Sequence, residues 1–374
     1  MESNPRGQEG SPIFDNFDVD LLIRVLANTA FSPFFVFFIP IFYIFQGLKL
    51  SHPIIIYTSF YYVLISAFWF IKWYSRLYRN QGSLFFRPPS LEWNEQIVII
   101  TGGASGIGEL LANTLAVRSV TVVVLDINPI VTENYNIAYY KCDVSKWEEV
   151  EAVSKKVIDE IGEPTILINN AGVVQGKPLV NLSQADVQQT FGANTLSHFW
   201  VLKAFLPSLL KNKSGHIITM SSALGMTGVA QMTDYCASKA AVIGLHESLR
   251  YELDKIYKCP QIRTTLVCPG HVQTSMFSTV TFPNFPAFKF LCPSVQPVTV
   301  VKRIIAALDD QHSQTILLPF YTNFIPYIRH LPSFLRDLVQ WISGADHAMR
   351  KFVKITSRRP DEGPLPSGFS TKKE

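Results

Sequence analysis

A short apolar run at residues 96–100 leads directly into a glycine-rich segment at residues 101–108, and a helix is expected at residues 109–117. A strand, a glycine turn and a helix in this order form the phosphate-binding loop of dinucleotide-binding folds. This segment therefore predicts an α/β domain whose first strand ends at a nucleotide site.

Each glycine of the loop has an expected function. Gly102 permits the tight turn, Gly106 lets the backbone approach a pyrophosphate, and Gly108 allows the helix to pack closely on the strand. A helix start also offers free N–H groups and the positive end of its dipole to phosphates. Ser105 and Ile107 lie at this start and are predicted to contact the cofactor.

Further β-rich runs alternate with helical segments after the loop. Parallel strands joined by helices form a doubly wound sheet. We therefore expect a Rossmann-type parallel sheet in a single catalytic domain at residues 95–310. The runs lie at residues 120–125, 139–144, 165–168 and 264–268.

Polar residues follow three of these strands. Asp126 stands where an acid commonly binds the adenosine ribose hydroxyls, and its charge would repel a 2′-phosphate. It predicts NAD rather than NADP; the alternative is an aspartate that only caps a turn. Asp143, followed by Val144, is expected to face the adenine. Segment 169–172, which contains Asn170, Ala171 and Gly172, is expected to brace the cofactor loop.

Tyr235 and Lys239 are separated by one helical turn, with Ser222 upstream. Positions i and i+4 share a helix face, so the ammonium can lie beside the phenol and lower its pKa. Such a tyrosine can exchange a proton with an alcohol or a carbonyl. The pair alone is equally consistent with a surface tyrosine beside a solvated lysine, so it depends on the cofactor site upstream.

Together these motifs resemble the short-chain dehydrogenase/reductase family over about residues 95–310, and most closely its membrane-associated retinol and 17β-hydroxysteroid dehydrogenase branch. The order and spacing of the motifs carry the resemblance. They are residues 101–108, Asp143, residues 169–172, Asn194, Ser222, Tyr235, Lys239 and Pro269-Gly270.

The resemblance implies a catalytic role for four residues. Tyr235 would be the acid/base, Lys239 would lower its pKa and bind the nicotinamide ribose, and Ser222 would bind the substrate oxygen. Ser221 is a rival for the last role, but its spacing to Tyr235 fits less well. Asn194 would hold a proton-relay water; alternatively it satisfies backbone groups at a helix kink.

The resemblance also implies that residues 269–274 close over the nicotinamide. Pro269, Gly270, Val272 and Thr274 would contact the cofactor, with Thr274 at its amide. Aromatic residues follow between 276 and 291 and predict a pocket for a long or polycyclic apolar substrate.

The N-terminal region lies outside the family pattern. After a polar lead-in (1–24), residues 25–48 contain no charged side chain, and residues 50–71 contain none except a neutral His52. Each run exceeds the roughly 18 apolar residues that suggest a bilayer span. We expect a membrane segment at 25–73 that makes two spans, one span or a hairpin within one leaflet, and a linker at 74–94. A helical hairpin buried against the catalytic domain is the alternative.

The charges after the second run predict the orientation. Lys72, Arg76, Arg79 and Arg87 place this flank, and with it the catalytic domain, on the cytosolic side. The endoplasmic reticulum or a lipid-droplet surface is the expected location. Five scattered cysteines fit a reducing compartment and show no metal-ligand spacing. No basic run interleaved with aromatics suggests nucleic acid.

Apolar residues recur at helical spacing within segment 311–356, where core packing and docking onto the bilayer are equally supported. Residues 357–374 are rich in Pro, Gly, Ser and charge and predict a disordered tail.

The sequence therefore predicts a membrane-anchored, NAD-dependent oxidoreductase for a retinol-like, steroid-like or other lipid alcohol, with a homodimer as a compatible assembly. An NADPH-dependent lipid ketone reductase and a non-catalytic, nucleotide-binding membrane adaptor are the alternatives.

Overall fold

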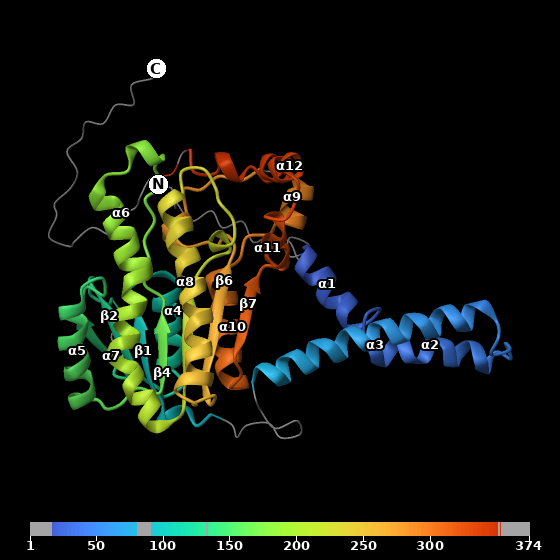
Figure 1. Cartoon of the computed structure of the whole chain (residues 1–374), viewed down its shortest axis with the longest axis horizontal. Coiled ribbons are helices and arrows are strands. Elements are labelled where there is room, and N and C mark those ends of the chain that lie inside the picture. Colours follow the sequence, from blue (N-terminus) through green and yellow to red (C-terminus); the bar gives the residue numbers. More distant parts are fainter. Residues whose placement is uncertain (1–16, 81–90, 132–133, 284, 351, 353–374) are drawn as a thin grey trace, which may run out of the picture.

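A computed structural model describes residues 17–80, 91–131, 134–283, 285–350 and 352. Its centre is a seven-stranded sheet in the order β3-β2-β1-β4-β5-β6-β7, in which every neighbouring pair is parallel (Figure 1). This confirms the predicted doubly wound sheet. The strands are β1 Ile97–Thr101, β2 Thr121–Asp126, β3 Ile137–Lys141, β4 Ile166–Asn169, β5 Gly215–Met220, β6 Ile262–Pro269 and β7 Gln314–Leu318.

Helices cover both faces of the sheet. Alternate residues of a strand point to opposite faces, so Val98 and Ile100 pack in one buried cluster and Ile99 in another. The first cluster is closed by α4 (Gly106–Ala116) and α10 (Pro297–Asp310). The second is closed by α5 (Trp147–Glu160), α7 (Ser197–Asn212) and α8 (Thr233–Tyr251).

The other helices of the catalytic domain are short and lie at the ends of the sheet or in the connections. They are α6 Gln184–Phe191, α9 Pro286–Leu291, α11 Ile325–Ile328 and α12 Ser333–Ser343. Short turns (η) are η2 Trp93–Glu95, η3 Leu179–Asn181, η5 Ala223–Gly225, η7 Ser275–Phe277, η8 Phe320–Phe324 and η9 Ala345–His347; the π-helical turns are η4 Gly192–Leu196 and η6 Glu252–Ile256.

The expected end of the catalytic domain, residue 310, requires correction. Residue 310 closes α10, but β7 follows and pairs in parallel with β6 as the edge strand of the sheet. Val267 and Ile316 are register partners in this pair, and both side chains are buried. A strand of this length carries a weak sequence signal beside the strongly apolar segments that follow it.

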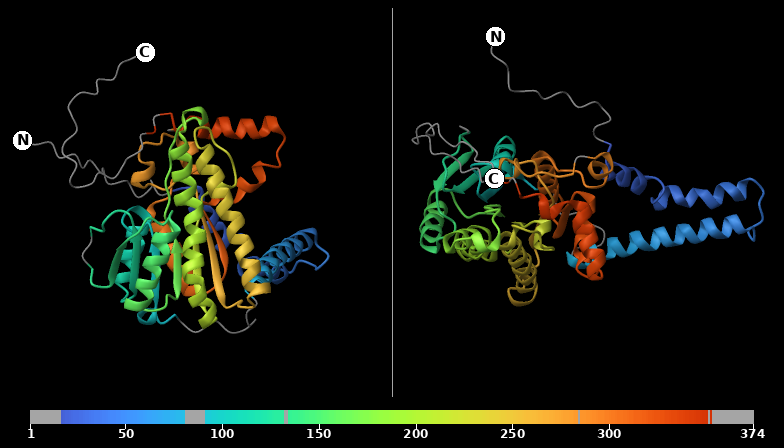
Figure 2. Two further views of the ribbon diagram at one scale, coloured as in Figure 1. Left: turned by 60° about the vertical axis from the view of Figure 1, so that its left-hand side comes forward. Right: turned by 90° about the horizontal axis from the view of Figure 1, so that it is seen from above.

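The N-terminal region contains α1 (Val19–Asn28), α2 (Pro33–Phe45) and α3 (Pro53–Arg79). Helices α2 and α3 lie side by side as a hairpin that extends away from the sheet on the β7 side (Figures 1 and 2). The predicted lead-in (1–24) is too long, because α1 already begins at Val19; residues 1–16 lie outside the described part. The predicted linker likewise begins too early, because α3 continues to Arg79.

Helix α3 is the one described helix long and apolar enough to cross a membrane alone. Only 6% of its most apolar window is buried. The first apolar run does not form a single straight span, because α1 and α2 meet at a bend of 53°. A hairpin buried against the domain is thus not observed, because many large apolar side chains of α2 and α3 are exposed. Arg87 and the expected disordered tail at 357–374 lie outside the described residues.

Candidate active site

A cavity of about 760 Å³ opens at the carboxyl ends of the strands. This is where open α/β sheets bind their ligands. Nearly every residue predicted for the site contributes to its lining. These are Gly102, Ser105, Gly106, Ile107, Asp126, Asp143, Val144, Asn170, Ala171, Gly172, Ser222, Tyr235, Lys239, Pro269, Gly270, Val272 and Thr274.

Two predicted residues, Gly108 and Asn194, lie behind the lining. A Cβ atom at Gly108 would stand 2.1 Å from the Gly102 carbonyl oxygen and 2.6 Å from Asn170 Nδ2. Gly108 thus lets α4 pack against the loop, as the glycine spacing predicts. Asn194 is fully buried in the π-helical turn η4.

The glycine loop has the geometry that a phosphate group requires. Gly102 and Gly106 adopt positive φ angles of 66° and 60°, which favour glycine. Ser105 is the N-cap residue of α4, yet its side chain makes no capping hydrogen bond. The N–H groups of the first turn are therefore available to an anion. The loop fits a dinucleotide pyrophosphate.

Asn170 braces this loop from β4. Its Nδ2 donates to the carbonyl oxygens of Thr101 (3.1 Å) and Gly102 (3.0 Å). In return, the Thr101 hydroxyl oxygen accepts from the backbone N–H groups of Asn170 (3.0 Å) and Ala171 (3.1 Å). The side-chain amide is thus committed to the protein, and the loop conformation depends on it.

The Asp126 carboxylate also shapes the loop. One oxygen accepts from the N–H of Ala104 (3.0 Å), and the other accepts from the N–H of Asn128 (2.9 Å). The turn-aspartate alternative therefore describes part of its role. Each carboxylate oxygen can accept a second hydrogen bond, and Asp126 lines the cavity. The two roles are compatible.

Asp143 lies at the same end of the cavity. One carboxylate oxygen accepts from both the N–H (3.1 Å) and the hydroxyl (2.6 Å) of Ser145. Burial raises the pKa of Asp143, but these bonds and the nearby Lys146 ammonium lower it below its ordinary value. Among the described cavity-lining residues, Lys239 is the one lysine or arginine.

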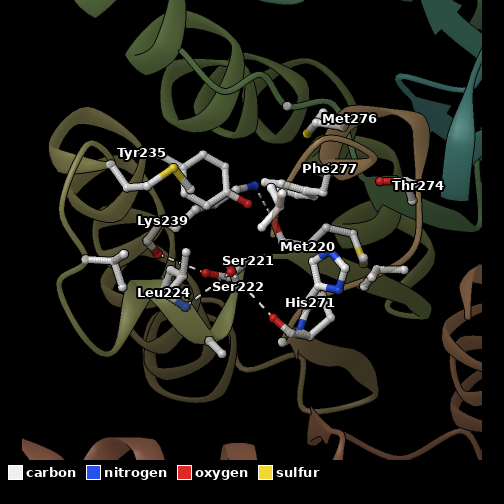
Figure 3. Close-up of a pocket in the computed structure, with 18 of the residues that line it drawn as sticks. Met220, Ser221, Ser222, Leu224, Tyr235, Lys239, His271, Thr274, Met276 and Phe277 are labelled. Atoms are coloured by element: carbon white, nitrogen blue, oxygen red, sulfur yellow. Dashed lines mark hydrogen bonds between the residues drawn. The ribbon is translucent and has the colours of Figure 1, made fainter. Parts of the chain in front are cut away.

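Tyr235, Lys239 and Ser222 converge in the middle of the cavity (Figure 3). Tyr235 and Lys239 come from α8, and Ser222 follows β5. The Lys239 Nζ atom lies 5.9 Å from the centroid of the Tyr235 ring. The Ser222 hydroxyl is near enough to Tyr235 to lower its pKa. It also donates to the Pro269 carbonyl at 3.4 Å and accepts from the N–H of Leu224 at 3.1 Å.

Ser221 points elsewhere. Its hydroxyl donates to the backbone carbonyl of Lys239 at 2.9 Å, which fixes α8 against β5. The geometry therefore favours Ser222 over Ser221 as the residue beside the Tyr235 hydroxyl, in line with the spacing.

The pKa of Tyr235 differs from the sequence expectation. Burial raises it to about 12, although the nearby Ser222 hydroxyl opposes the rise. Burial also lowers the pKa of Lys239 to about 8. The Lys239 ammonium donates to the Met220 carbonyl at 3.0 Å instead of contacting the phenol oxygen. Removing the phenolate from water therefore outweighs the attraction of the lysine in this arrangement.

The Asn194 side chain satisfies backbone groups, which was the alternative to a role in holding a relay water. Its Oδ1 accepts from the N–H of Val173 (2.7 Å), and its Nδ2 donates to the Val173 carbonyl and to the Ser238 hydroxyl, both at 3.0 Å. A Cβ at Gly172 would meet both Asn194 Oδ1 (3.3 Å) and Lys239 Nζ (3.6 Å). Asn194 is thus close to Lys239, but its amide has protein partners.

The other half of the cavity is apolar. Met276, Phe277, Phe282 and Phe288 line it, as the sequence predicts for the stretch after Thr274. Phe285 and Leu291 are exposed instead. The sequence reasoning missed a second wall from the C-terminal segment. Its members include Tyr321, Phe324, Tyr327, Ile328, Leu331, Val339 and Met349. The apolar periodicity of this segment was a signal for an apolar face, but it does not reveal what the face covers.

Comparison with known proteins supports the same interpretation. The family model described as short chain dehydrogenase matches residues 96–282. Retinol dehydrogenase 10-B of Danio rerio is 36% identical over 300 residues, which cover 72% of this chain and 88% of that protein. Epidermal retinol dehydrogenase 2 of Homo sapiens is 35% identical over 69% of this chain and 85% of that protein.

A solved structure resembles the catalytic domain. A 4-hydroxyisoleucine dehydrogenase complexed with NADH shares 25% of its residues and superimposes with a TM-score of 0.52, covering 60% of this chain and 96% of that one. The chain therefore belongs to the short-chain dehydrogenase family and is an oxidoreductase that acts on CH–OH groups with a nicotinamide cofactor.

Proposed function

We propose that this protein is an NAD-dependent, membrane-anchored dehydrogenase of apolar, lipid-like alcohols. The observation that carries the proposal is the position of Tyr235, Ser222 and Lys239 in the cavity lining. Lys239 lies beside Gly172 of the polar half, and the Tyr235 ring packs on Phe277 of the apolar half. A substrate hydroxyl at this junction would meet both hydroxyl groups while its apolar body occupies the rest of the cavity.

In this proposal Tyr235 takes the proton of the substrate hydroxyl. Ser222 binds the substrate oxygen and steadies the charge that develops on it. Lys239 binds the nicotinamide ribose and favours the phenolate. When bound, the nicotinamide would supply the acceptor for the hydride of the carbinol carbon, and its positive charge would also favour the phenolate. The side-chain amide of Asn194 is committed to Val173 and Ser238. A relay water would therefore have to bind the backbone carbonyl of Asn194.

The cofactor would lie along the glycine loop, with its pyrophosphate at the start of α4 and its adenosine beside Asp126 and Asp143. Val144, Ala171 and Gly172 would flank it, and Pro269, Gly270, Val272 and Thr274 would close over the nicotinamide. The preference for NAD rests on Asp126 and on the composition of the lining beside it, because Lys239, at the catalytic centre, is the one lysine or arginine among the described lining residues. In a cell where NAD is mostly oxidised, this favours alcohol oxidation.

Asp126→Asn is expected to relax the preference for NAD over NADP by at least tenfold. The charge that repels a 2′-phosphate is lost, and two like charges about 4 Å apart repel by a few kcal/mol near a protein surface. An amide oxygen can still accept from Ala104 or Asn128, so the loop is disturbed less than in Asp126→Ala. KM values for both cofactors measure the effect. Asn128→Ala, at the same end of the cavity, is the control; an unchanged preference in Asp126→Asn would exclude this role.

The apolar lining suits a retinol-like or steroid-like alcohol, and two relatives are named retinol dehydrogenases. An NADPH-dependent lipid ketone reductase is the alternative. KM values for the two cofactors, measured on the unmodified chain, distinguish it from an NAD-dependent dehydrogenase. A non-catalytic adaptor would bind NADH but turn over no apolar alcohol or ketone. The homodimer stays a prediction.

The membrane location is supported by the outward-facing hairpin and by α12. No residue of α12 is buried, and Trp341 is 76% exposed. Elements around the cavity mouth, α9 and α11, lie on the same side as the hairpin (Figures 1 and 2). We infer that α12 docks on the bilayer beside the anchor, so that a substrate enters from the lipid.

The full chain is expected to stay in the membrane pellet after alkaline carbonate extraction. Two N-glycosylation sequons, at Asn181 and Asn212, are both exposed. They report on which side of the membrane the catalytic domain lies. A cytosolic domain leaves them unmodified, so treatment with a glycosidase should not change the mobility of the chain on a gel. Release by carbonate would contradict the anchor, and a mobility shift would place the domain in the lumen.

A further inference from the structure

The N-terminal anchor contacts both ends of the edge strand β7. At the amino end, Asn80 follows α3 and is buried. The N–H of Ser313 donates to Asn80 Oδ1 at 2.6 Å, and Arg263 donates to the Asn80 carbonyl at 2.7 Å. Arg250 also donates to the Arg79 carbonyl. The base of α3 is therefore joined to the start of β6 and β7.

At the carboxyl end of β7, the contact comes from α1. The N–H of Phe320, the first residue of η8, donates to Asp20 Oδ1 at 2.8 Å. The ring of Phe17 lies 5.5 Å from that of Phe290 in α9. Helix α1 thus contacts η8, and the residue before its N-cap contacts α9. These two segments line the apolar end of the cavity.

Helix α1 is also bound to α3 at its other end. Tyr61 donates to the Ala30 carbonyl at 2.8 Å, and Trp69 donates to the Phe31 carbonyl at 2.6 Å. Both acceptors lie in the turn between α1 and α2. The position of α1 therefore follows the position of the anchor helix.

The segment that Asp20 contacts reaches the catalytic centre. Tyr321 lines the cavity, and its hydroxyl lies beside the backbone of Gly270 and His271. A Cβ at Gly270 would lie 2.5 Å from this hydroxyl. Residue 321 thus packs on the loop that is expected to close over the nicotinamide.

We propose that α1 is a strap that couples the membrane anchor to the wall of the substrate cavity, with Asp20 as its positioning residue. The Asp20 carboxylate fixes the start of segment 320–331 and so sets the shape of the apolar end. The end of the cavity expected to hold the adenosine and the pyrophosphate is built at β1, β2 and β4, away from this contact. The strap itself follows from the contacts; its effect on substrate binding rests on the proposed function.

The test uses the full chain in lipid nanodiscs and hydrogen–deuterium exchange of segment 320–331. Asp20→Ala should speed this exchange by roughly tenfold, the factor that one hydrogen bond to a carboxylate contributes. Asp20→Asn keeps an acceptor oxygen and should restore most of the protection. Asn28→Ala is the matched control, because its exposed side chain bonds only to its own helix.

The second measurement is kinetic, with all-trans-retinol and NAD as the probe pair. Asp20→Ala should raise KM for the alcohol several-fold and leave the dissociation constant of NADH unchanged. The strap would be overturned if segment 320–331 exchanged at the same rate in Asp20→Ala and in the unmodified chain. It would also be overturned if the affinity for NADH fell by the same factor as KM for the alcohol rose. If the unmodified chain does not oxidise retinol, the substrate assignment fails, but the exchange experiment still decides on the strap.

Discussion

Tyr235→Phe is expected to lower turnover of an apolar alcohol by about 10³-fold while NADH remains bound. General acid–base catalysis contributes factors of this order, and phenylalanine keeps the ring but removes the group that exchanges the proton. The ring is buried and packs against Phe277, so the variant should keep the shape of the cavity. Single-turnover kinetics and NADH fluorescence titration separate the two effects.

Tyr251→Phe provides the control for this experiment. Tyr251 ends the same helix, α8, but is 69% exposed and lies outside the cavity lining. The same chemical change there should leave turnover unaltered. Retained activity in Tyr235→Phe would refute the role proposed for the phenol. Absence of activity in the unmodified chain, with NADH bound, would instead favour the non-catalytic adaptor.

Gly108→Ala is expected to abolish cofactor binding. The added methyl group would stand 2.1 Å from the Gly102 carbonyl oxygen, well inside van der Waals contact, so the loop or α4 must move. The loop N–H groups would then no longer face the pyrophosphate. Overpacking of this kind also costs about 1–3 kcal/mol of folding stability. NADH titration and thermal unfolding measure the two consequences.

Gly244→Ala is the matched control on the other side of the sheet. Gly244 lies within α8, and a Cβ there would meet nothing within 4 Å. Alanine in a helix interior is favoured over glycine by up to about 1 kcal/mol, so this variant should be as stable as the unmodified chain or more so. The prediction would be contradicted if Gly108→Ala bound NADH as tightly as Gly244→Ala does. The loop would then not need the close packing of Gly108 on the Gly102 carbonyl.

Much of the site could be predicted because its signals are local. The glycine loop, Asn170 and the Tyr235–Lys239 pair each lie within a few residues of a strand end or on one helix turn. Their backbone geometry follows from short-range rules, such as the positive φ of Gly102 and the shared face of positions i and i+4. The alternation of β-rich and helical runs likewise predicted the parallel sheet. Its strands are continuous apolar runs because both faces of the sheet are buried.

The electrostatics of the site could not be predicted in the same way. The sequence places Lys239 beside Tyr235, but the pKa of the phenol depends on how much water the surrounding segments exclude. Burial raises that pKa, and the lysine ammonium is held by the Met220 carbonyl. Likewise, the two backbone partners of Asp126 appear only when the loop is folded onto β2.

The sequence by itself therefore determined the fold class, the cofactor loop and the set of polar residues at the cavity. Tertiary structure alone decided that β7 completes the sheet, that the C-terminal segment walls the cavity, and that the anchor contacts both ends of β7. The physical reason is distance along the chain. Asn80 and Ser313 are 233 residues apart, and Asp20 and Phe320 are 300 apart. Such contacts form only when packing brings distant segments together, and no local pattern encodes them.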